Sequence, residues 1–251
     1  MSESKRQAIA IAEILIWLAA GYVFASEPQT FESGDTQSSL IELFTSEGCS
    51  SCPPAEKWLT ALKSNLELWK RIVPVAFHVD YWDHLGWRDR FAKQEFTSRQ
   101  QRYAAVWGGD SVYTPGFVVN GKEWRNWFGG NAVPTISTRV GVLRVSLGDG
   151  GKLTAAFVPE TTQPRALALD VALLGNDLES DVKRGENSGR KLRHDFVVLD
   201  LIKIDMVKQS KSWTGSLALP MQPANGKPTA IAAWITEDGT PIQATGGWLQ
   251  R

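Results

Sequence analysis

The chain has 251 residues, 43% of them hydrophobic, which is enough for one large or two ordinary domains with apolar cores. Its 27 basic and 27 acidic residues balance to a formal net charge of +0, and they form no basic stripe. Because nucleic-acid binding depends on clustered Lys and Arg, we expect no nucleic-acid partner.

Residues 1–25 predict a signal peptide. Lys5 and Arg6 form a basic start, an apolar run follows, and Ala25 ends a small-residue cleavage pattern. The run at residues 14–24 is shorter than the roughly 20 apolar residues of a membrane span. We therefore expect export to a bacterial periplasm, where disulfides persist, with no stable membrane insertion after cleavage. An uncleaved anchor and a buried helix are the alternatives.

A polar linker at residues 26–37 precedes a predicted α/β segment at residues 38–130. Hydrophobic periodicity predicts, in chain order, a strand at 39–44, a helix at 55–68, a strand at 72–79, a helix at 88–106 and a strand at 116–119. The dipeptide Asn120-Gly121 predicts a tight hairpin turn after the last strand. This order of elements is typical of a small α/β domain.

Residues 131–251 have a different character. Short β-rich runs occupy residues 140–147, 153–158, 166–174, 194–204, 215–219 and 229–236, and turn-forming residues separate them. Several strands at this spacing predict an all-β sandwich. We therefore place a domain boundary near residue 131.

The two cysteines are the main clue to function. Cys49 and Cys52 form a Cys-x-x-Cys motif between a predicted strand and a predicted helix, the position of the redox site in thioredoxin-like proteins. We expect Cys49, just outside the helix, to be the more exposed sulfur and to have a pKa lowered by the helix N-terminus. Cys49 is then the attacking thiolate and Cys52 the resolving thiol. A structural disulfide and a metal site are the alternatives, although a metal needs further ligands.

Thr114-Pro115 is the second candidate element. A cis-Pro opposite the cysteines would present the edge of the Thr114 peptide to a substrate, and only proline makes a cis bond energetically accessible. The alternative is a trans proline that begins an ordinary strand.

A third candidate region, residues 77–87, is dense in polar and aromatic side chains. His78 and Asp80 share one side of a strand end, and Trp82, Asp83 and His84 follow in a loop. Such a group suits a binding wall or acid–base groups beside the thiols. Alternatively, Asp83 caps a turn while Trp82 and Trp87 pack in the core. Ligation by the two histidines and Asp80 matches no strong metal signature, so we assign no metal and no cofactor.

Residues 183–194 lie between two predicted strands and are rich in Gly and charged residues. A binding loop is one interpretation. We prefer a solvated connection, with His194 as a residue at the start of a strand.

These residues together resemble the DUF1223 family of bacterial secreted proteins, which have a thioredoxin-like fold and no established function. The matching segments are ELFTSEGCSSCPP at 42–54, FHVDYWDHLGW at 77–87, VYTP at 112–115 and VVNG at 118–121, with Arg99-Gln100, Tyr103, Gly185-Glu186-Asn187, Gly189, Leu192 and His194. The resemblance covers nearly the whole chain after the signal peptide.

The resemblance implies an α/β thioredoxin-like domain followed by an all-β sandwich-like domain. By analogy with thioredoxin-like proteins, Cys49 is the nucleophile, Cys52 the resolving thiol and Pro115 the cis-Pro. The chain departs from these patterns in three places. Gly48 stands where thioredoxins usually carry Trp, Ser50-Ser51 replaces their Gly-Pro, and Gly116 stands where the family has Gln. These departures leave the direction of electron flow open.

We therefore expect thiol–disulfide exchange with a protein or small-molecule disulfide or dithiol, and an unidentified redox partner. Two other functions remain open. One is a redox-inactive binding protein that uses Trp82, Trp87, Trp107 and the β-domain. The other is periplasmic copper handling by Cys49, Cys52 and a histidine.

Overall fold

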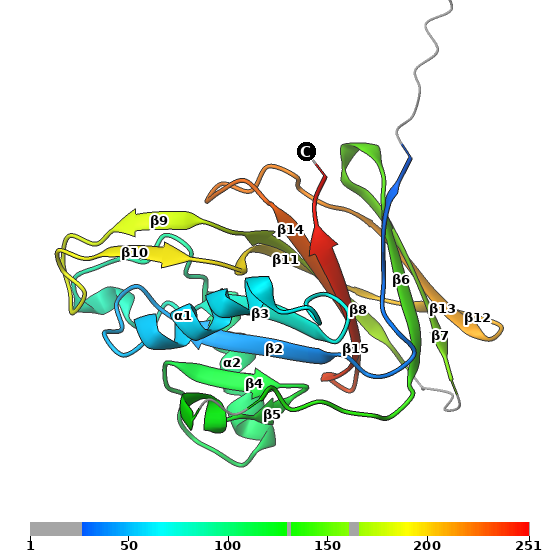
Figure 1. Ribbon diagram of the computed structural model, residues 1–251, viewed down its shortest axis with the longest axis horizontal. Helices are drawn as coiled ribbons and strands as arrows, with labels where there is room; N and C mark the ends of the chain where they lie inside the picture. Colours follow the sequence, from blue (N-terminus) through cyan, green and yellow to red (C-terminus); the bar gives the residue numbers. More distant parts are fainter. Residues whose placement is uncertain (1–26, 130–131, 161–165, 251) are drawn as a thin grey trace, which may run out of the picture.

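A computed structural model describes residues 27–129, 132–160 and 166–250. The predicted signal peptide at residues 1–25 lies outside these ranges. The described chain forms two α-helices, α1 (Pro53–Ala61) and α2 (Gln94–Val106), and fifteen β-strands in three sheets (Figure 1). Within the same ranges, neither helix combines the length and the apolar character needed to cross a bilayer.

The strands in chain order are β1 (Gln29–Glu32), β2 (Ser39–Thr45), β3 (Ile72–His78), β4 (Gly116–Val119), β5 (Lys122–Glu123), β6 (Gly141–Leu147), β7 (Lys152–Pro159), β8 (Ala168–Gly175), β9 (Leu178–Asp181), β10 (Lys191–His194), β11 (Val197–Asp205), β12 (Val207–Gln209), β13 (Ser212–Ala218), β14 (Ala230–Glu237) and β15 (Thr240–Trp248). Short 3-10 helices occupy Leu62–Ser64, Asp83–Leu85, Asn126–Gly129 and Asp149–Gly151.

The central element is an eight-stranded mixed sheet in the order β15-β14-β8-β11-β3-β2-β4-β5. Its two parallel pairs are β2 with β3 and β3 with β11, and the other neighbours are antiparallel. Every residue of β2 and β3 is buried. Such continuous burial is expected for strands that are covered on both faces.

Helix α2 covers one face of this sheet. Phe96 and Tyr103 of α2 pack against Phe44 of β2 and Phe77 of β3. Helix α1 lies on the opposite face, where Leu59 packs with apolar side chains of β2 and β4. The side chains therefore alternate between two apolar layers along each strand.

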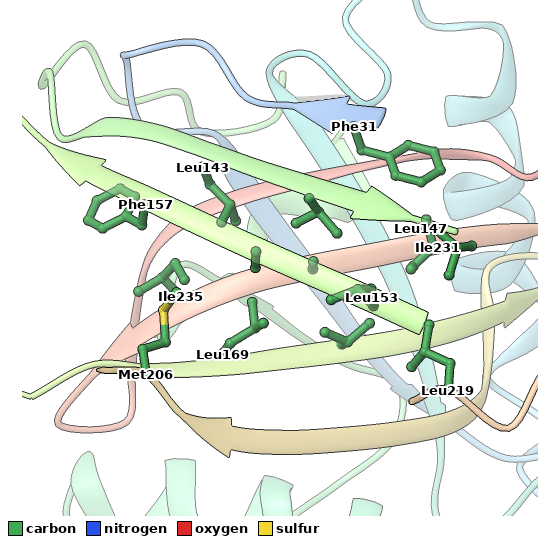
Figure 2. Packing of buried hydrophobic residues seen from close by; sticks show 14 of the residues in the cluster. Phe31, Leu143, Leu147, Leu153, Phe157, Leu169, Met206, Leu219, Ile231 and Ile235 are labelled. Carbon is green, nitrogen blue, oxygen red and sulfur yellow. The ribbon is translucent and has the colours of Figure 1, made fainter. Parts of the chain in front are cut away.

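The second sheet has the strand order β1-β6-β7-β13-β12. It covers the same face of the central sheet as α1 does, but it lies over strands β8 and β14. Figure 2 shows the apolar cluster between the sheets, in which Phe157 and Leu153 of β7 face Leu169 of β8 and Ile231 of β14. Strands β9 and β10 form a separate two-stranded ribbon beside α1 (Figure 1).

The expected α/β thioredoxin-like domain followed by an all-β sandwich-like domain is wrong. Within the described residues the fold is β-rich, with two α-helices and three sheets. The central sheet joins strands from both sides of residue 131, because β11 pairs in parallel with β3 through Val197 and Ala76. Local periodicity identifies strands but does not show which distant strand each one pairs with, and this is why the prediction failed.

Local features follow the sequence more closely. Asn120 and Gly121 join β4 to β5 with φ angles of 47° and 78°, which confirms the predicted hairpin turn. The predicted helix at 88–106 begins only at Gln94, and the preceding loop buries Asp89 and Phe91. Helix α1 ends at Ala61 rather than continuing to residue 68.

Leu169→Ala should lower the free energy of unfolding by about 2–5 kcal/mol, because it opens a cavity between the two sheets. Denaturant unfolding of the purified protein measures the change. Val158→Ala on β7 is the control, since that side chain is 52% exposed and its truncation should cost less than about 1 kcal/mol. Equal losses would show that Leu169 is not a core residue.

Candidate functional site

The two cysteines lie in the loop between β2 and α1. Cys52 is the N-cap of α1, and its carbonyl accepts hydrogen bonds from the N–H groups of Ala55 at 2.9 Å and Glu56 at 3.1 Å. The helix then begins with Pro53 and Pro54, which have no N–H to donate. The expected strand–cysteine pair–helix order is therefore present.

The two thiols have opposite pKa shifts. A hydrogen bond from the Cys52 thiol is the main cause that lowers the pKa of Cys49 to about 6, and Ser51, whose Oγ lies 3.2 Å from the sulfur, adds to it. Burial raises the pKa of Cys52 well above its usual value, as does its hydrogen bond to Cys49. The lowered pKa of Cys49 agrees in direction with the prediction, and its main cause is the hydrogen bond from the second thiol.

Cys49 is the less deeply buried of the two sulfurs, as predicted, but it is not exposed. Both cysteines have 0% of their surface exposed. A reagent or ligand therefore reaches the Cys49 sulfur only when the groups around it move.

The Thr114–Pro115 peptide bond is cis, as predicted. The carbonyl oxygen of Thr114 lies 3.7 Å from the sulfur of Cys49, and the Thr114 hydroxyl accepts a hydrogen bond of 2.8 Å from Nε1 of Trp82. Thr114, Pro115 and Trp82, three of the predicted site residues, thus lie together at the thiol.

The loop between β9 and β10 packs on the cysteine loop. Nδ2 of Asn187, a residue with no exposed surface, donates hydrogen bonds of 2.9 Å to the carbonyls of both Glu47 and Cys49. The exposed Glu186 carboxylate accepts hydrogen bonds from the N–H and the hydroxyl of Ser50, at 3.0 and 2.6 Å. The interpretation of residues 183–194 as a solvated connection is therefore wrong for this part of the loop.

A cluster of buried ionisable side chains lies on the α1 face of the sheet, next to the cysteine loop. Its members come from separate segments of the chain and are each at most 8% exposed: Glu47, Glu56, His78, Asp89 and His194. Burying a charge is costly unless the charge is paired and hydrogen-bonded. The contacts within the cluster therefore determine which of its side chains carry a charge.

His78 and Asp89 form one half of the cluster. Nδ1 of His78 lies 2.6 Å from Oδ2 of Asp89. The same carboxylate accepts the N–H of Glu47 at 2.9 Å and that of Phe91 at 2.9 Å, so its orientation is fixed by the backbone.

His194 lies between two carboxylates in the other half. Its Nδ1 is 2.5 Å from Oε2 of Glu56 and its Nε2 is 3.3 Å from Oε1 of Glu47. Burial acts to lower the pKa of His194, but the charge of Glu56 and the adjacent Glu47 carboxylate raise it to about 10. Burial acts to raise the pKa of Glu47, yet the neighbouring His194 and Ser180 and the hydrogen bond from Trp87 lower it to about 2.

Other predicted binding residues do not join this cluster. Oδ1 of Asp80 accepts a hydrogen bond from Thr97 of α2 at 2.5 Å, and Oδ1 of Asp83 accepts the N–H of Asp89 at 3.1 Å. His84 is exposed. His78, Asp80 and His84 were considered as metal ligands from the sequence. In the structure these three residues do not form one site. Glu56, His78 and His194 instead bring ligand atoms to within 4.8 Å of one another.

The sequence contained a partial signal for the residues that were missed. Glu47 lies two residues before Cys49, and Glu56 lies one helical turn after Cys52, so both were close to the recognised motif. Asn187 and His194 carried no such signal, because their proximity depends on the pairing of distant strands.

The pH dependence of alkylation tests the pKa of Cys49. With iodoacetamide and peptide mapping, its rate in the reduced protein should rise with pH and level off above about pH 6, rather than near 8.5 as for an ordinary cysteine. Burial limits the absolute rate but not this midpoint. Cys52→Ala should move the midpoint upward, because it removes the hydrogen bond that lowers the pKa; a midpoint near 8.5 in the wild type would contradict the assignment.

Asn187→Ala should lower the free energy of unfolding by about 1–3 kcal/mol, because two carbonyls of the cysteine loop lose their donor. Urea unfolding measures the loss. Ser188→Ala removes an exposed side chain from the same loop and should cost under about 0.5 kcal/mol. Similar values for both variants would mean that Asn187 does not anchor the loop.

Comparison with known proteins identifies the family. A family profile described as "Protein of unknown function (DUF1223)" matches residues 40–236, which include both cysteines and the whole buried cluster. A crystal structure of a protein from Agrobacterium tumefaciens is 24% identical, with a TM-score of 0.60, and the match covers 85% of this chain and 94% of that one. HBP35 of Porphyromonas gingivalis is 16% identical, with a TM-score of 0.56 over 86% of this chain and 76% of that one.

At these identities the two structures support the fold alone. No curated protein matches the chain. Because the family profile spans most of the sequence, the chain belongs to the DUF1223 family.

Proposed function

We propose that this protein catalyses thiol–disulfide exchange after export to the periplasm. The observation that carries the proposal is the pair of adjacent thiols with opposite pKa shifts, lowered to about 6 for Cys49 and raised for Cys52. At neutral pH the first is a thiolate, which is the nucleophilic form, and the second keeps its proton.

The exchange proceeds in two displacements. The Cys49 thiolate attacks one sulfur of a substrate disulfide, forms a mixed disulfide and expels the other substrate sulfur as a thiolate. Cys52 then loses its proton to solvent and attacks Cys49, which forms the Cys49–Cys52 disulfide and releases the second substrate thiolate. The substrate gains two electrons and the cysteine pair loses two.

The surroundings of Cys49 support a disulfide in an extended polypeptide as the substrate. The Thr114 carbonyl lies beside the sulfur, where it is available as a hydrogen-bond acceptor to an extended chain once the site opens. A thiol or disulfide partner then returns the cysteine pair to its starting state. The reduction potential of the pair decides whether the protein donates or removes disulfides.

The tryptophans favour this function over a redox-inactive aromatic binding wall. The indole N–H groups of Trp82 and Trp87 bond inward, to Thr114 at 2.8 Å and to Glu47 at 2.6 Å. These contacts hold the walls of the thiol site rather than present a stacking surface.

Insulin reduction and isomerisation of a scrambled disulfide substrate test the proposal. The wild type should accelerate at least one of the two reactions, and Cys49→Ser should return it to the uncatalysed rate because the nucleophile is gone. Cys52→Ala should instead accumulate a mixed disulfide, visible as an added substrate mass on Cys49. Equal rates for the wild type and Cys49→Ser would refute the function, and stoichiometric Cu(I) binding lost in Cys49→Ser would favour copper handling.

A further inference from the structure

The buried cluster contains more negative than positive groups. Three carboxylates, those of Glu47, Glu56 and Asp89, face two imidazoles, those of His78 and His194. With one imidazole protonated, two negative charges are left over inside the protein. A net charge of this kind is costly to bury, and a divalent cation that replaces this one proton would halve it.

Three of these residues offer ligand atoms that converge. One ligand atom from each of Glu56, His78 and His194 lies within 4.8 Å of the other two, and the two imidazole rings are 5.1 Å apart at an angle of 81°. Two histidines and a glutamate form a common donor set for zinc and for related divalent transition metals.

Both histidines have a carboxylate on the side of the ring that faces away from the proposed centre. Asp89 holds Nδ1 of His78, which leaves Nε2 of that ring for a ligand, and Glu47 lies 3.3 Å from Nε2 of His194, on the side away from Glu56. Metal-binding histidines almost always donate their other ring N–H to a carboxylate, a backbone carbonyl or a water, because this contact fixes the tautomer and strengthens the donor nitrogen.

The third proposed ligand, the carboxylate of Glu56, is also oriented by a hydrogen bond. The hydroxyl of Thr45 donates a hydrogen bond of 2.6 Å to Oε1 of Glu56, which leaves Oε2 toward His194. Oε2 of Glu47 accepts the indole N–H of Trp87 at 2.6 Å, so the carboxylate beside His194 is fixed as well.

Two buried atoms in this arrangement are incompletely satisfied. Within the described part of the chain, Oε1 of Glu47 and Nε2 of His194 have no well-aligned hydrogen bond, although they lie 3.3 Å apart. A rotation of the His194 ring that moves Nδ1 toward a central ion would let Nε2–H point at Glu47. The unsatisfied pair thus supports a ligand at the centre.

We propose that Glu56, His78 and His194 bind a divalent transition-metal ion of the zinc type, through Oε2, Nε2 and Nδ1 respectively. The ion displaces the proton between His194 and Glu56, so binding releases a proton. With bonds of about 2.0–2.2 Å, tetrahedral ligand atoms lie about 3.4 Å apart. Nδ1 of His194 and Oε2 of Glu56, which lie 2.5 Å apart, must therefore separate by about 0.9 Å, and the other ligand pairs must draw in by up to about 1.4 Å. This site is separate from the thiol chemistry and does not depend on it.

The test uses the chain with Cys49→Ser and Cys52→Ser, so that no thiol can hold the metal. After removal of metals with a chelator, titration with ZnCl2 should show one ion per chain, a raised Tm, and an enthalpy that varies with the buffer because a proton is released. X-ray absorption at the zinc edge should show imidazole nitrogen and carboxylate oxygen as ligands.

Variants of the three histidines give a matched comparison. His78→Gln and His194→Gln should each weaken zinc binding at least about 100-fold because a ligand is lost, and Asp89→Asn should weaken it about 10- to 100-fold. His84→Gln should bind zinc as the parent does, since His84 is exposed and outside the cluster.

Three results would overturn the proposal: no stoichiometric zinc binding to the cysteine-free chain, binding unaffected by both His78→Gln and His194→Gln, or an absorption spectrum without imidazole ligands. If a histidine variant does not fold, the X-ray absorption spectrum of the zinc-loaded parent chain shows whether imidazole nitrogen binds the metal. The insulin and isomerisation assays on the wild type test the thiol function independently, so each proposal can fail alone.

Discussion

The parallel contact between β3 and β11 is the constraint on which the rest of the structure depends. It is short: Val197 lies beside Ala76, and the N–H of Ala76 donates to the carbonyl of Phe196 at 2.8 Å. Through it, the strands of the C-terminal half extend the sheet that carries the cysteine loop. It also places His194, three residues before Val197, in ring contact with His78 at the end of β3.

The same contact explains why ionisable side chains are buried beside the thiols. The segment before β11 supplies an imidazole between two carboxylates of the N-terminal half, and the loop before β10 supplies the amide of Asn187 to the cysteine loop. Neither half of the chain by itself supplies hydrogen-bond partners for all of its buried polar groups. Because unpaired buried charges are strongly destabilising, the polar contacts here specify how the two halves fit together.

Sequence patterns predicted the features that depend on neighbouring residues. The strand before Cys49, the helix after Cys52 and the Asn120-Gly121 turn each follow from local composition. The cis Thr114–Pro115 bond was predicted by analogy with thioredoxin-like redox sites, because the local sequence only permits it. The fold class did not, because the pairing of β3 with β11 has no local signature and an apolar strand is compatible with many neighbours. For the same reason His194 was interpreted as an ordinary residue at a strand start, although it lies at the centre of the buried cluster.

The enclosure of Cys49 has a consequence for its chemical durability. A thiolate that is ionised at neutral pH is the form that peroxides oxidise to sulfenic and then sulfinic acid, and the second step is irreversible in most proteins. With no exposed surface, the sulfur meets such oxidants only during the intervals in which its surroundings open. The closed loop therefore protects a reactive sulfur from small oxidants in solution, and a molecule that opens the loop upon binding reacts with it in preference to them.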